Sequence, residues 1–287
     1  METERKPFYR SILFWELLAT GLVLLGLIAG ICIGLRNGKQ PAAAAKTMQT
    51  VPPANTQETL PPLPENPYSP EDFAYEGDYL TCLTDESVLG VDVSYWQGEI
   101  DWQQVKQAGV EFAMIRLGWR GSEQGLIFPD DYVQINYEGA RKAGLKVGGY
   151  FFSQAITVEE ALEEAAFVLD MVQSWQLDMP IVFDWEPVEP EVRTAVVDRE
   201  TLTACARAFC GEIQKAGFQP MIYFNPILAQ ERLNIQELAE FPCWLAMYDH
   251  PMDYPYRVDM WQYTASGIVP GIADEVDLNL YFPYTEA

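Results

Sequence analysis

The stretch KVGGYFFSQAITVEEALEEAAFVLDMVQSWQLDMPIVFDWE, residues 146–186, decides the fold class of this chain. Residues 146–152 and 180–186 are short runs of β-branched, aromatic and other apolar residues, a composition typical of buried strands. Between them, residues 157–175 carry apolar side chains at i, i+3 and i+4 spacing, which is typical of an amphipathic helix. A strand, a helix and another strand in this order predict two parallel strands joined by a helical crossover.

The same alternation extends in both directions along the chain. Strand-like runs occur eight times, at residues 88–94, 112–118, 146–152, 180–186, 220–224, 243–248, 258–263 and 275–281. Helical patterns follow only the first five runs, and Asp101, Asp131 and Thr157 are expected to cap three of these helices. Eight strands with five crossovers predict an α/β fold, a TIM-like barrel with a reduced last third, over residues 88–287. A doubly wound open sheet is the alternative, but neither a GxGxxG nor a GxxxxGK[ST] motif opens any of the helices.

A strongly apolar stretch lies near the start of the chain. Residues 17–35 contain no charged residue and are long enough, as a helix, to cross the hydrocarbon core of a bilayer. We therefore expect a short cytoplasmic N-terminus over residues 1–10 and a transmembrane helix over residues 11–36. A cleaved signal peptide is the alternative, and the length of the apolar stretch disfavours it. Three basic residues flank the stretch on each side, so charge alone leaves its orientation open.

The segment between this stretch and the barrel has a composition of its own. Residues 37–87 contain a run of four alanines and eight prolines, without a sustained strand or helix period. Such a composition predicts a Pro/Ala-rich linker, part extended and part flexible.

The charge of the chain excludes several classes of function. The chain holds 18 basic and 42 acidic residues, a formal net charge of −24. This excess of acid opposes binding to nucleic acid, which requires a basic face, and it opposes adhesion of the barrel surface to anionic lipid. A single histidine removes most Ser-His-Asp, Cys-His and histidine-based zinc schemes. Carboxylate chemistry is therefore the first direction to consider.

Four acids lie in or at the ends of predicted strands. Asp92 lies near the end of the first strand, Asp184 and Glu186 close the fourth, and Asp277 belongs to the last. Residues i and i+2 of a strand share a face, so Asp184 and Glu186 point to the same side. The strand ends of a TIM-type barrel form its active site, and we expect the four acids to meet there. A magnesium or calcium site is the competing interpretation, but no phosphate-binding loop accompanies the acids, so we expect neither a metal nor another cofactor.

Crowded carboxyl groups predict a particular chemistry. Their charges raise each other's pKa, so that one group stays protonated near neutral pH as a general acid while others remain ionised. We expect the charge of Asp184 to contribute to such a rise at Glu186. Two carboxyl groups with these roles are typical of glycoside hydrolysis. Residues near strand ends are expected to contact the sugar: Arg116, Tyr150, Trp185, Tyr223, Asn225, Trp244, Tyr248 and Gln262.

Five motifs together resemble glycoside hydrolase family 25, the barrel lysozymes that cut peptidoglycan. In chain order they are GVDVSYWQGEIDW (90–102), PIVFDWE (180–186), MIYFN (221–225), WLAMY (244–248) and WQYTASGIVPGIADEVDLN (261–279). The resemblance covers residues 88–287 and implies a (β/α)5β3 barrel. It also implies that Glu186 is the general acid and that Asp184 positions the 2-acetamido group or supports the developing charge. Asp92 and Asp277 would complete the site.

Together with the apolar stretch at residues 17–35, the resemblance implies a membrane-anchored peptidoglycan hydrolase that cleaves the β-1,4 bond between N-acetylmuramic acid and N-acetylglucosamine. Its expected place is the cell membrane, as a single-pass protein with the catalytic domain extracytoplasmic. Its expected partners are the glycan strands of peptidoglycan and, through the N-terminal helix, the membrane. No wall-binding repeat follows the last strand, and we expect the anchor and linker to substitute for one. A non-catalytic peptidoglycan-binding or scaffold module on the same fold and a chitinase-like hydrolase of another acetamido glycan are the alternatives.

Overall fold

The computed structural model describes residues 60–188, 193–248 and 252–283. The chain divides into two units, Met1–Gln57 and Glu58–Ala287, and all described residues belong to the second. The predicted cytoplasmic N-terminus, the transmembrane helix and the first part of the linker lie outside the described residues. Among the residues that are described, no helix is both long and apolar enough to cross a membrane.

Eight strands close into a barrel. The strands are β3 (Val88–Val93), β4 (Phe112–Arg120), β6 (Lys146–Ser153), β7 (Ile181–Trp185), β8 (Pro220–Phe224), β9 (Cys243–Ala246), β10 (Met260–Gly267) and β11 (Val276–Tyr281). They are hydrogen-bonded in the order β3-β11-β10-β9-β8-β7-β6-β4, and pairing between β3 and β4 closes the ring. All neighbouring pairs are parallel except those of β11, which runs antiparallel to both β10 and β3. The predicted eight-stranded barrel is confirmed.

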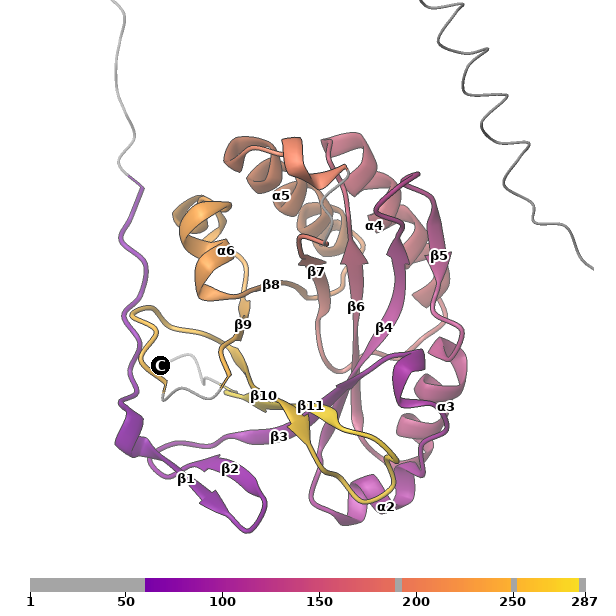
Figure 1. The fold of residues 1–287 in the computed structure, drawn as a ribbon, viewed down its shortest axis with the longest axis vertical. Helices are drawn as coiled ribbons and strands as arrows, with labels where there is room; N and C mark the ends of the chain where they lie inside the picture. Colours follow the sequence, from indigo (N-terminus) through magenta and orange to yellow (C-terminus); the bar gives the residue numbers. More distant parts are fainter. Residues whose placement is uncertain (1–59, 189–192, 249–251, 284–287) are drawn as a thin grey trace, which may run out of the picture. The chain divides into compact units, whose positions relative to one another are not determined.

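Helices follow the first five barrel strands, as the sequence pattern predicts (Figure 1). They are α2 (Trp102–Gln107), α3 (Val133–Ala143), α4 (Val158–Val172), α5 (Arg199–Lys215) and α6 (Pro226–Glu231). Short 3-10 turns also occur, at η3 (Tyr95–Gln97), η4 (Thr194–Val196) and η5 (Ile235–Leu238). Asp101 and Thr157 cap their helices as expected. The expected cap at Asp131 is wrong, because Tyr132 is the N-cap residue of α3.

Side chains of the barrel strands alternate between two apolar layers. The barrel interior is filled mainly by large residues, among them Phe112, Met114, Val182, Met221, Tyr223, Trp244 and Met260. The second layer lies between the strands and the helices, where Phe183 of β7 packs against Phe209 of α5 at 5.3 Å between ring centroids. On β7, Val182 belongs to the interior layer and Phe183 to the outer one, so period-2 alternation places Asp184 on the interior side.

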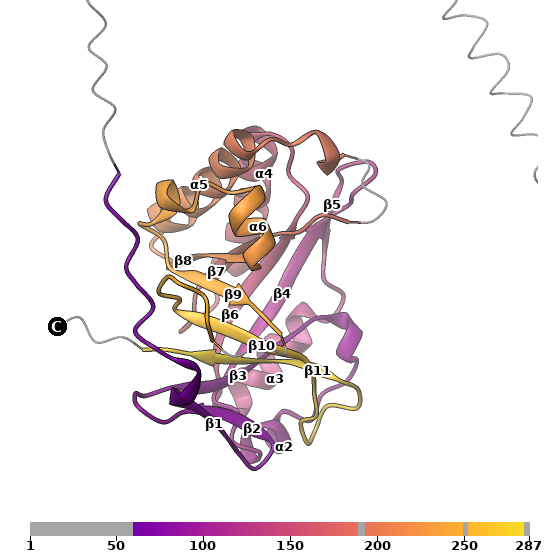
Figure 2. The same cartoon turned by 60° about the vertical axis from the view of Figure 1, so that its left-hand side comes forward.

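Part of the expected linker is ordered against the barrel, which corrects the boundary at residue 87. Residues 70–82 form a turn, η2 (Pro70–Asp72), and an antiparallel hairpin of β1 (Phe73–Glu76) and β2 (Tyr79–Cys82). Just before them, Glu65 forms a β-bridge with Tyr256. Figure 2 shows this indigo segment running along one side of the barrel to the hairpin. Its aromatic and apolar side chains pack on the core, which compensates for the absence of a periodic pattern.

Candidate active site

Strand geometry brings the four predicted acids to one rim of the barrel. Asp184 lies near the end of β7, Glu186 follows that strand directly, and Asp92 lies near the end of β3. Asp277 is at the start of β11, directly opposite Asp92 in the strand register. Because β11 is antiparallel, its start lies where the parallel strands end. The charge of Asp92 acts on the pKa values of the three other acids, in agreement with one compact cluster.

Asp92 is the most extensively hydrogen-bonded acid of this cluster. Its side chain is almost fully buried, and its Oδ2 accepts hydrogen bonds from Gln262 Nε2 and Asn279 Nδ2, both at 2.8 Å. Burial raises the pKa of Asp92, whereas the hydrogen bonds from Asn279, Gln262 and Asp277 lower it. The two amides therefore favour the ionised form of a carboxyl group that burial alone would neutralise.

Both amides are themselves oriented by aromatic donors. Gln262 Oε1 accepts hydrogen bonds from the hydroxyl groups of Tyr223 at 3.0 Å and Tyr248 at 2.6 Å. Asn279 Oδ1 accepts one from Trp244 Nε1 at 2.8 Å. With each amide oxygen occupied in this way, each NH2 group is left to face Asp92.

Asp92 and Asp277 lie opposite each other across the β3–β11 pair and are linked by a side-chain hydrogen bond. The pKa of Asp277 is raised to about 9, first by burial, then by the charge of Asp92 and by a side-chain hydrogen bond to it. That bond lowers the pKa of Asp92, as expected when Asp277 is the protonated partner and donates. The hydrogen bonds that Asp92 accepts therefore favour ionisation of Asp92 over that of Asp277.

Asp184 lies deeper than Glu186 and has an unsatisfied oxygen. Its pKa is raised well above the usual value by burial first, and then by the charges of Glu186 and Asp92. The positive charge of Arg116 opposes this rise. Within the described residues, its buried Oδ1 atom has no hydrogen-bond partner. Such an atom is available to a ligand that offers a polar group.

Glu186 has a pKa suited to proton donation near neutral pH. The pKa is raised to about 7, first by burial and second by the charge of Asp92. The expected contribution from Asp184 is not among these causes. The backbone carbonyl of Glu186 accepts a hydrogen bond from the fully buried Gln154 at 2.5 Å. This bond fixes the main chain at the point where the strand ends.

Three of the predicted sugar-contact residues border the cluster. Tyr150 on β6 has a raised pKa, through burial first and also through the charges of Asp92 and Asp184. Tyr248 is 38% exposed and reaches the site through its hydroxyl group. Arg116 on β4 lies close enough to affect the pKa of Asp184.

The other predicted contacts have different places in the structure. Trp185 lies on the far face of β7, where its Nε1 donates to Ala155 O at 3.0 Å, because adjacent strand residues point to opposite sides. Asn225 caps α6 through its Oδ1. Tyr223, Trp244 and Gln262 are buried and belong to the hydrogen-bonded support of Asp92.

Asn279 is the main residue of the site that the sequence analysis missed. It lies two residues after Asp277, on the same face of β11. The same i, i+2 spacing groups Asp184 with Glu186. Applied to the strand of Asp277, it would have identified Asn279 as a residue of the site. Among the described residues, no group of three or more histidine, cysteine, aspartate or glutamate side chains is arranged to hold a metal ion.

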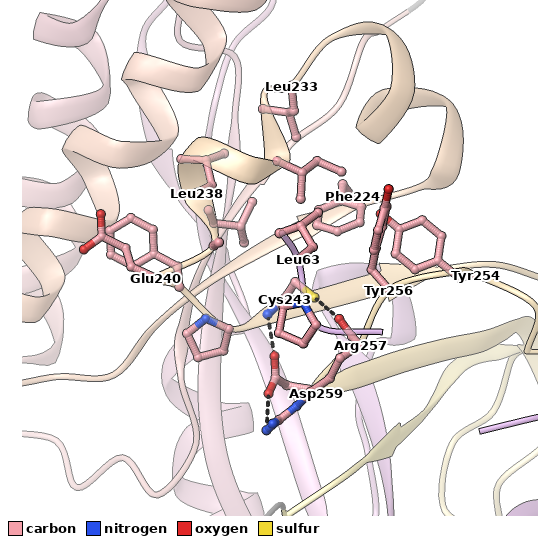
Figure 3. A pocket seen from close by; sticks show the side chains of 16 residues that line it. Leu63, Phe224, Leu233, Leu238, Glu240, Cys243, Tyr254, Tyr256, Arg257 and Asp259 are labelled. Atoms are coloured by element: carbon pink, nitrogen blue, oxygen red, sulfur yellow. Dashed lines mark hydrogen bonds and ion pairs between the residues drawn. The ribbon is translucent and has the colours of Figure 1, made fainter. Parts of the chain in front are cut away.

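A separate pocket of about 390 Å³ lies away from the carboxyl groups (Figure 3). It is lined largely by apolar side chains from residues 63–64, from the α6–η5 region and from the segment before β10. Its polar groups pair with one another, since Asp259 accepts from the backbone N–H of Cys243 at 2.9 Å. None of the four clustered acids lines this pocket, so it is not part of the candidate active site.

Comparison with known sequences agrees with this geometry. The sequence model of a family described as "Glycosyl hydrolases family 25" matches residues 91–272. The autolytic lysozyme of Clostridium acetobutylicum is 28% identical over 193 residues, which is 66% of this chain and 54% of that protein. The chain therefore matches about half the length of this relative.

Solved structures show the same fold. The bacterial lysozyme from Streptomyces coelicolor has a TM-score of 0.56 and 26% identity, covering 70% of this chain and 94% of that one. The modular autolysin LytC from Streptococcus pneumoniae, solved in complex with a synthetic peptidoglycan ligand, has a TM-score of 0.62 and 23% identity. That likeness covers 69% of this chain and 47% of LytC, and it concerns the fold alone.

Proposed function

Since the chain belongs to glycoside hydrolase family 25, we propose that it hydrolyses the β-1,4 bond between N-acetylmuramic acid and N-acetylglucosamine in peptidoglycan. The observation that carries this proposal is the cluster of four carboxyl groups at one barrel rim. Two of its relatives, named above, are a lysozyme and an autolytic lysozyme. The glycan strand is the partner that this site would bind.

Glu186 acts as the general acid in this proposal. A general acid must be protonated when the substrate arrives and must give its proton to the leaving oxygen. A pKa of about 7 leaves a large fraction of Glu186 protonated at neutral pH. Its carboxyl group is partly exposed, whereas that of Asp184 is almost fully buried, so Glu186 is the better placed to meet the glycosidic oxygen.

The other three acids support the reaction in two ways. The unpartnered Oδ1 of Asp184 is suited to the 2-acetamido group, which offers both an N–H donor and a carbonyl acceptor. Asp92, whose ionised form is favoured by its hydrogen bonds, supplies negative charge beside positive charge that develops on the sugar ring. Gln262 and Asn279 hold that charge in place before the substrate arrives.

The test compares cell-wall digestion by the wild type and by Glu186→Gln, which keeps the shape of the side chain and removes the proton donor. We expect turnover to fall by about 10²–10⁴-fold with no change in folding. Glu159→Gln, at an exposed position of α4, is the matched control and should digest walls like the wild type. Release of reducing ends from defined peptidoglycan is the measurement.

The outcomes separate the alternatives. A Glu186→Gln variant that digests walls at nearly the wild-type rate would show that the assigned acid is wrong. A wild-type protein that binds walls and releases no reducing ends would be a non-catalytic binding or scaffold module. Mass spectrometry of the products distinguishes a muramidase from a chitinase-like hydrolase of another acetamido glycan.

The apolar stretch at residues 17–35 leads to a second part of the proposal, in which a single transmembrane helix tethers the domain to the outer side of the cell membrane. The support is the length of the uncharged stretch and the location of the wall outside the membrane. Protease added to intact cells should then release a fragment that begins shortly before Glu58, where the second unit starts. Release of this fragment only after lysis would reverse the orientation.

A further inference from the structure

A row of four aromatic side chains borders the carboxyl rim on its β4 side. Trp96 packs on Tyr95 with 4.5 Å between ring centroids, and Tyr95 faces Trp119 at 6.3 Å. Trp119 stacks on Phe128 at 5.6 Å. The interplanar angles along the row are 31°, 33° and 28°, so the first two ring pairs are tilted and Trp119 and Phe128 are stacked. We call Tyr95, Trp96, Trp119 and Phe128 the aromatic row.

The local strand geometry explains why these side chains come together. Residues Tyr95 and Trp96 belong to η3, which directly follows β3. A short strand, β5 (Ile127–Pro129), pairs with the last part of β4 beyond the point where β3 ends. In this hairpin Trp119 lies directly opposite Phe128. The ring contacts of Trp119 with Tyr95 and with Phe128 join the hairpin to the segment after β3. Figure 1 shows β5 beside the end part of β4.

A register shift between β4 and β6 brings the aromatic row level with the carboxyl cluster. Along β4 the pairing with β6 shifts between Arg116 and Gly118, so that Trp119 is paired with Phe152. Phe152 in turn is paired with Asp184 on β7, which places Trp119 level with this acid. The guanidinium of Arg116 lies over the ring of Trp119 at 5.1 Å, so both side chains are on the same side of β4.

Arg116 links the row to the carboxyl cluster. Its guanidinium also lies over the ring of Tyr95 at 5.0 Å and pairs with the buried Asp130 at 2.8 Å. Its charge lowers the pKa values of Asp184 and Tyr150. The row is therefore continuous with the site through one residue that contacts two of its rings.

The two end rings of the aromatic row are exposed to solvent, whereas the β4–β5 hairpin that carries part of the row is fixed by buried contacts. Trp96 is 68% exposed and Phe128 is 41% exposed. Arg120, at the base of the hairpin, donates from Nε to Glu164 at 2.6 Å and from Nη1 to Gly125 O at 2.6 Å. Both Arg120 and Glu164 are buried, so the hairpin is anchored to α4. A rigid exposed aromatic surface loses little conformational entropy when a ligand binds.

We propose that the aromatic row binds sugar rings of the same glycan strand beyond the two sugars whose bond is cut. Pyranose rings present apolar C–H faces that pack on aromatic rings, and a row that continues from the site matches a linear polymer. This inference rests on the proposed function for the identity of the polymer. It adds a distal binding surface that selects longer glycans.

The experiment measures kcat/KM of the full-length protein on peptide-free glycan oligomers of increasing length. Trp96→Ala and Phe128→Ala each remove one exposed ring, and we expect losses that grow with glycan length to about 3–10-fold, mainly through KM. Trp96→Phe keeps an aromatic face and should restore most of the loss. Tyr75→Ala removes a ring that is 65% exposed on the distant β1–β2 hairpin and should have no effect.

Binding to the same oligomers is also measured in the Glu186→Gln background, where no cleavage interferes. Weaker binding by the row variants supports the inference even if the wild type cleaves none of the glycans, in which case only the proposed function fails. Unchanged binding and unchanged kcat/KM at every length would overturn it. A loss that is equal at all lengths, or that occurs only when stem peptides are attached, would overturn the assignment to distal sugars.

Discussion

Asp92 carries the negative charge around which the other carboxyl groups of the site titrate. Burial is the first cause of the rise of the Glu186 pKa to about 7, and the charge of Asp92 is the second; the same charge contributes to the rise at Asp277 and Asp184. The amides of Gln262 and Asn279 keep this charge stable in a buried position. Beyond burial, the raised pKa of Glu186 therefore depends on a residue of a different strand rather than on its neighbour Asp184.

The pH profile of the reaction tests this dependence. A general acid loses activity as pH rises through its pKa, so the basic limb of kcat/KM should fall near pH 7. Asp92→Asn removes a charge that raises the pKa of Glu186, and the limb should move to lower pH by up to about one unit. Asp184→Asn should move it less, because the charge of Asp184 is not among the causes of the raised pKa of Glu186. Where activity is too low, a carbon-13 NMR titration measures the pKa of Glu186 directly in each variant. A larger fall of this pKa in Asp184→Asn than in Asp92→Asn would contradict the dependence on Asp92.

Asp277 also gives the folded protein a characteristic dependence on pH. Its pKa is about 9 in the folded state and near 3.9 in an unfolded chain, so between these values the folded state holds a proton that the unfolded state releases. The contribution of this group to stability therefore decreases as pH rises from about 4 to 9. Asp277→Asn removes the titration and should increase the free energy of unfolding at pH 8 by at least about 1 kcal/mol, while lowering activity.

Urea unfolding at pH 6 and pH 9 is the measurement for this variant. The difference in stability between the two pH values should shrink in Asp277→Asn. Asp274→Asn, at an exposed position before β11, is the control and should keep the wild-type difference. An unchanged pH dependence in Asp277→Asn would show that this carboxyl group does not hold a proton in the folded protein.

At the scale of elements, the β4–β5 hairpin depends on one buried ion pair. Arg120 and Glu164 are both almost fully buried, and Ser153 donates a further hydrogen bond to Glu164 at 2.6 Å. Removing one member of a buried pair leaves the other without its partner in a low dielectric. The hairpin that carries Trp119 and Phe128 therefore depends on a contact with α4 that lies outside the site.

Replacing Arg120 tests the energetic weight of this contact. Arg120→Met should lower the free energy of unfolding by up to about 3–5 kcal/mol. Because burial already raises the pKa of Glu164 to about 7, Glu164 can take up a proton, and the loss should be largest above pH 7. Glu163→Gln removes a mainly exposed partner of the same arginine, and about 0–1 kcal/mol is expected there. The free energies of unfolding of both variants are compared by guanidinium chloride unfolding. Equal losses would show that the buried Arg120–Glu164 pair contributes no more to stability than the Arg120–Glu163 pair.

The eight strands and five helices could be predicted because each carries a clear period. The direction of β11 could not, since apolar alternation is the same in a parallel and an antiparallel strand. The same alternation places Asp184 and Glu186 on one face of β7 and so already excludes Trp185 from it. The hydrogen bonds of Asp92 join residues up to 187 positions apart and depend on register, which one strand's sequence does not specify.

At the scale of the whole molecule, the folded unit begins earlier than its periodic pattern. The segment before β3 contributes Tyr68, whose ring lies 4.9 Å from Phe282, and Phe73, whose ring lies 5.2 Å from Trp261. Asn66 also donates to Tyr254 O at 2.8 Å. These contacts cover the β10–β11 side of the barrel, where no helix follows the strands in the described residues. The proline-rich composition of the segment before β3 therefore does not reveal that this segment packs on the barrel.

Two shortened chains distinguish a linker from such an element. A chain over residues 58–287 should unfold cooperatively with the stability of the corresponding unit in the full protein. A chain over residues 88–287 loses the apolar contacts of Tyr68, Phe73 and Leu80, each about 1–2 kcal/mol when partly buried. Its free energy of unfolding should therefore be lower by about 3–5 kcal/mol, and proteases should cut it faster. Equal stability of the two chains would mean that residues 58–87 only connect the barrel to what precedes it. A loss of about 3–5 kcal/mol would instead show that residues 58–87 belong to the folded unit, which leaves only the residues before Glu58 as the proposed tether.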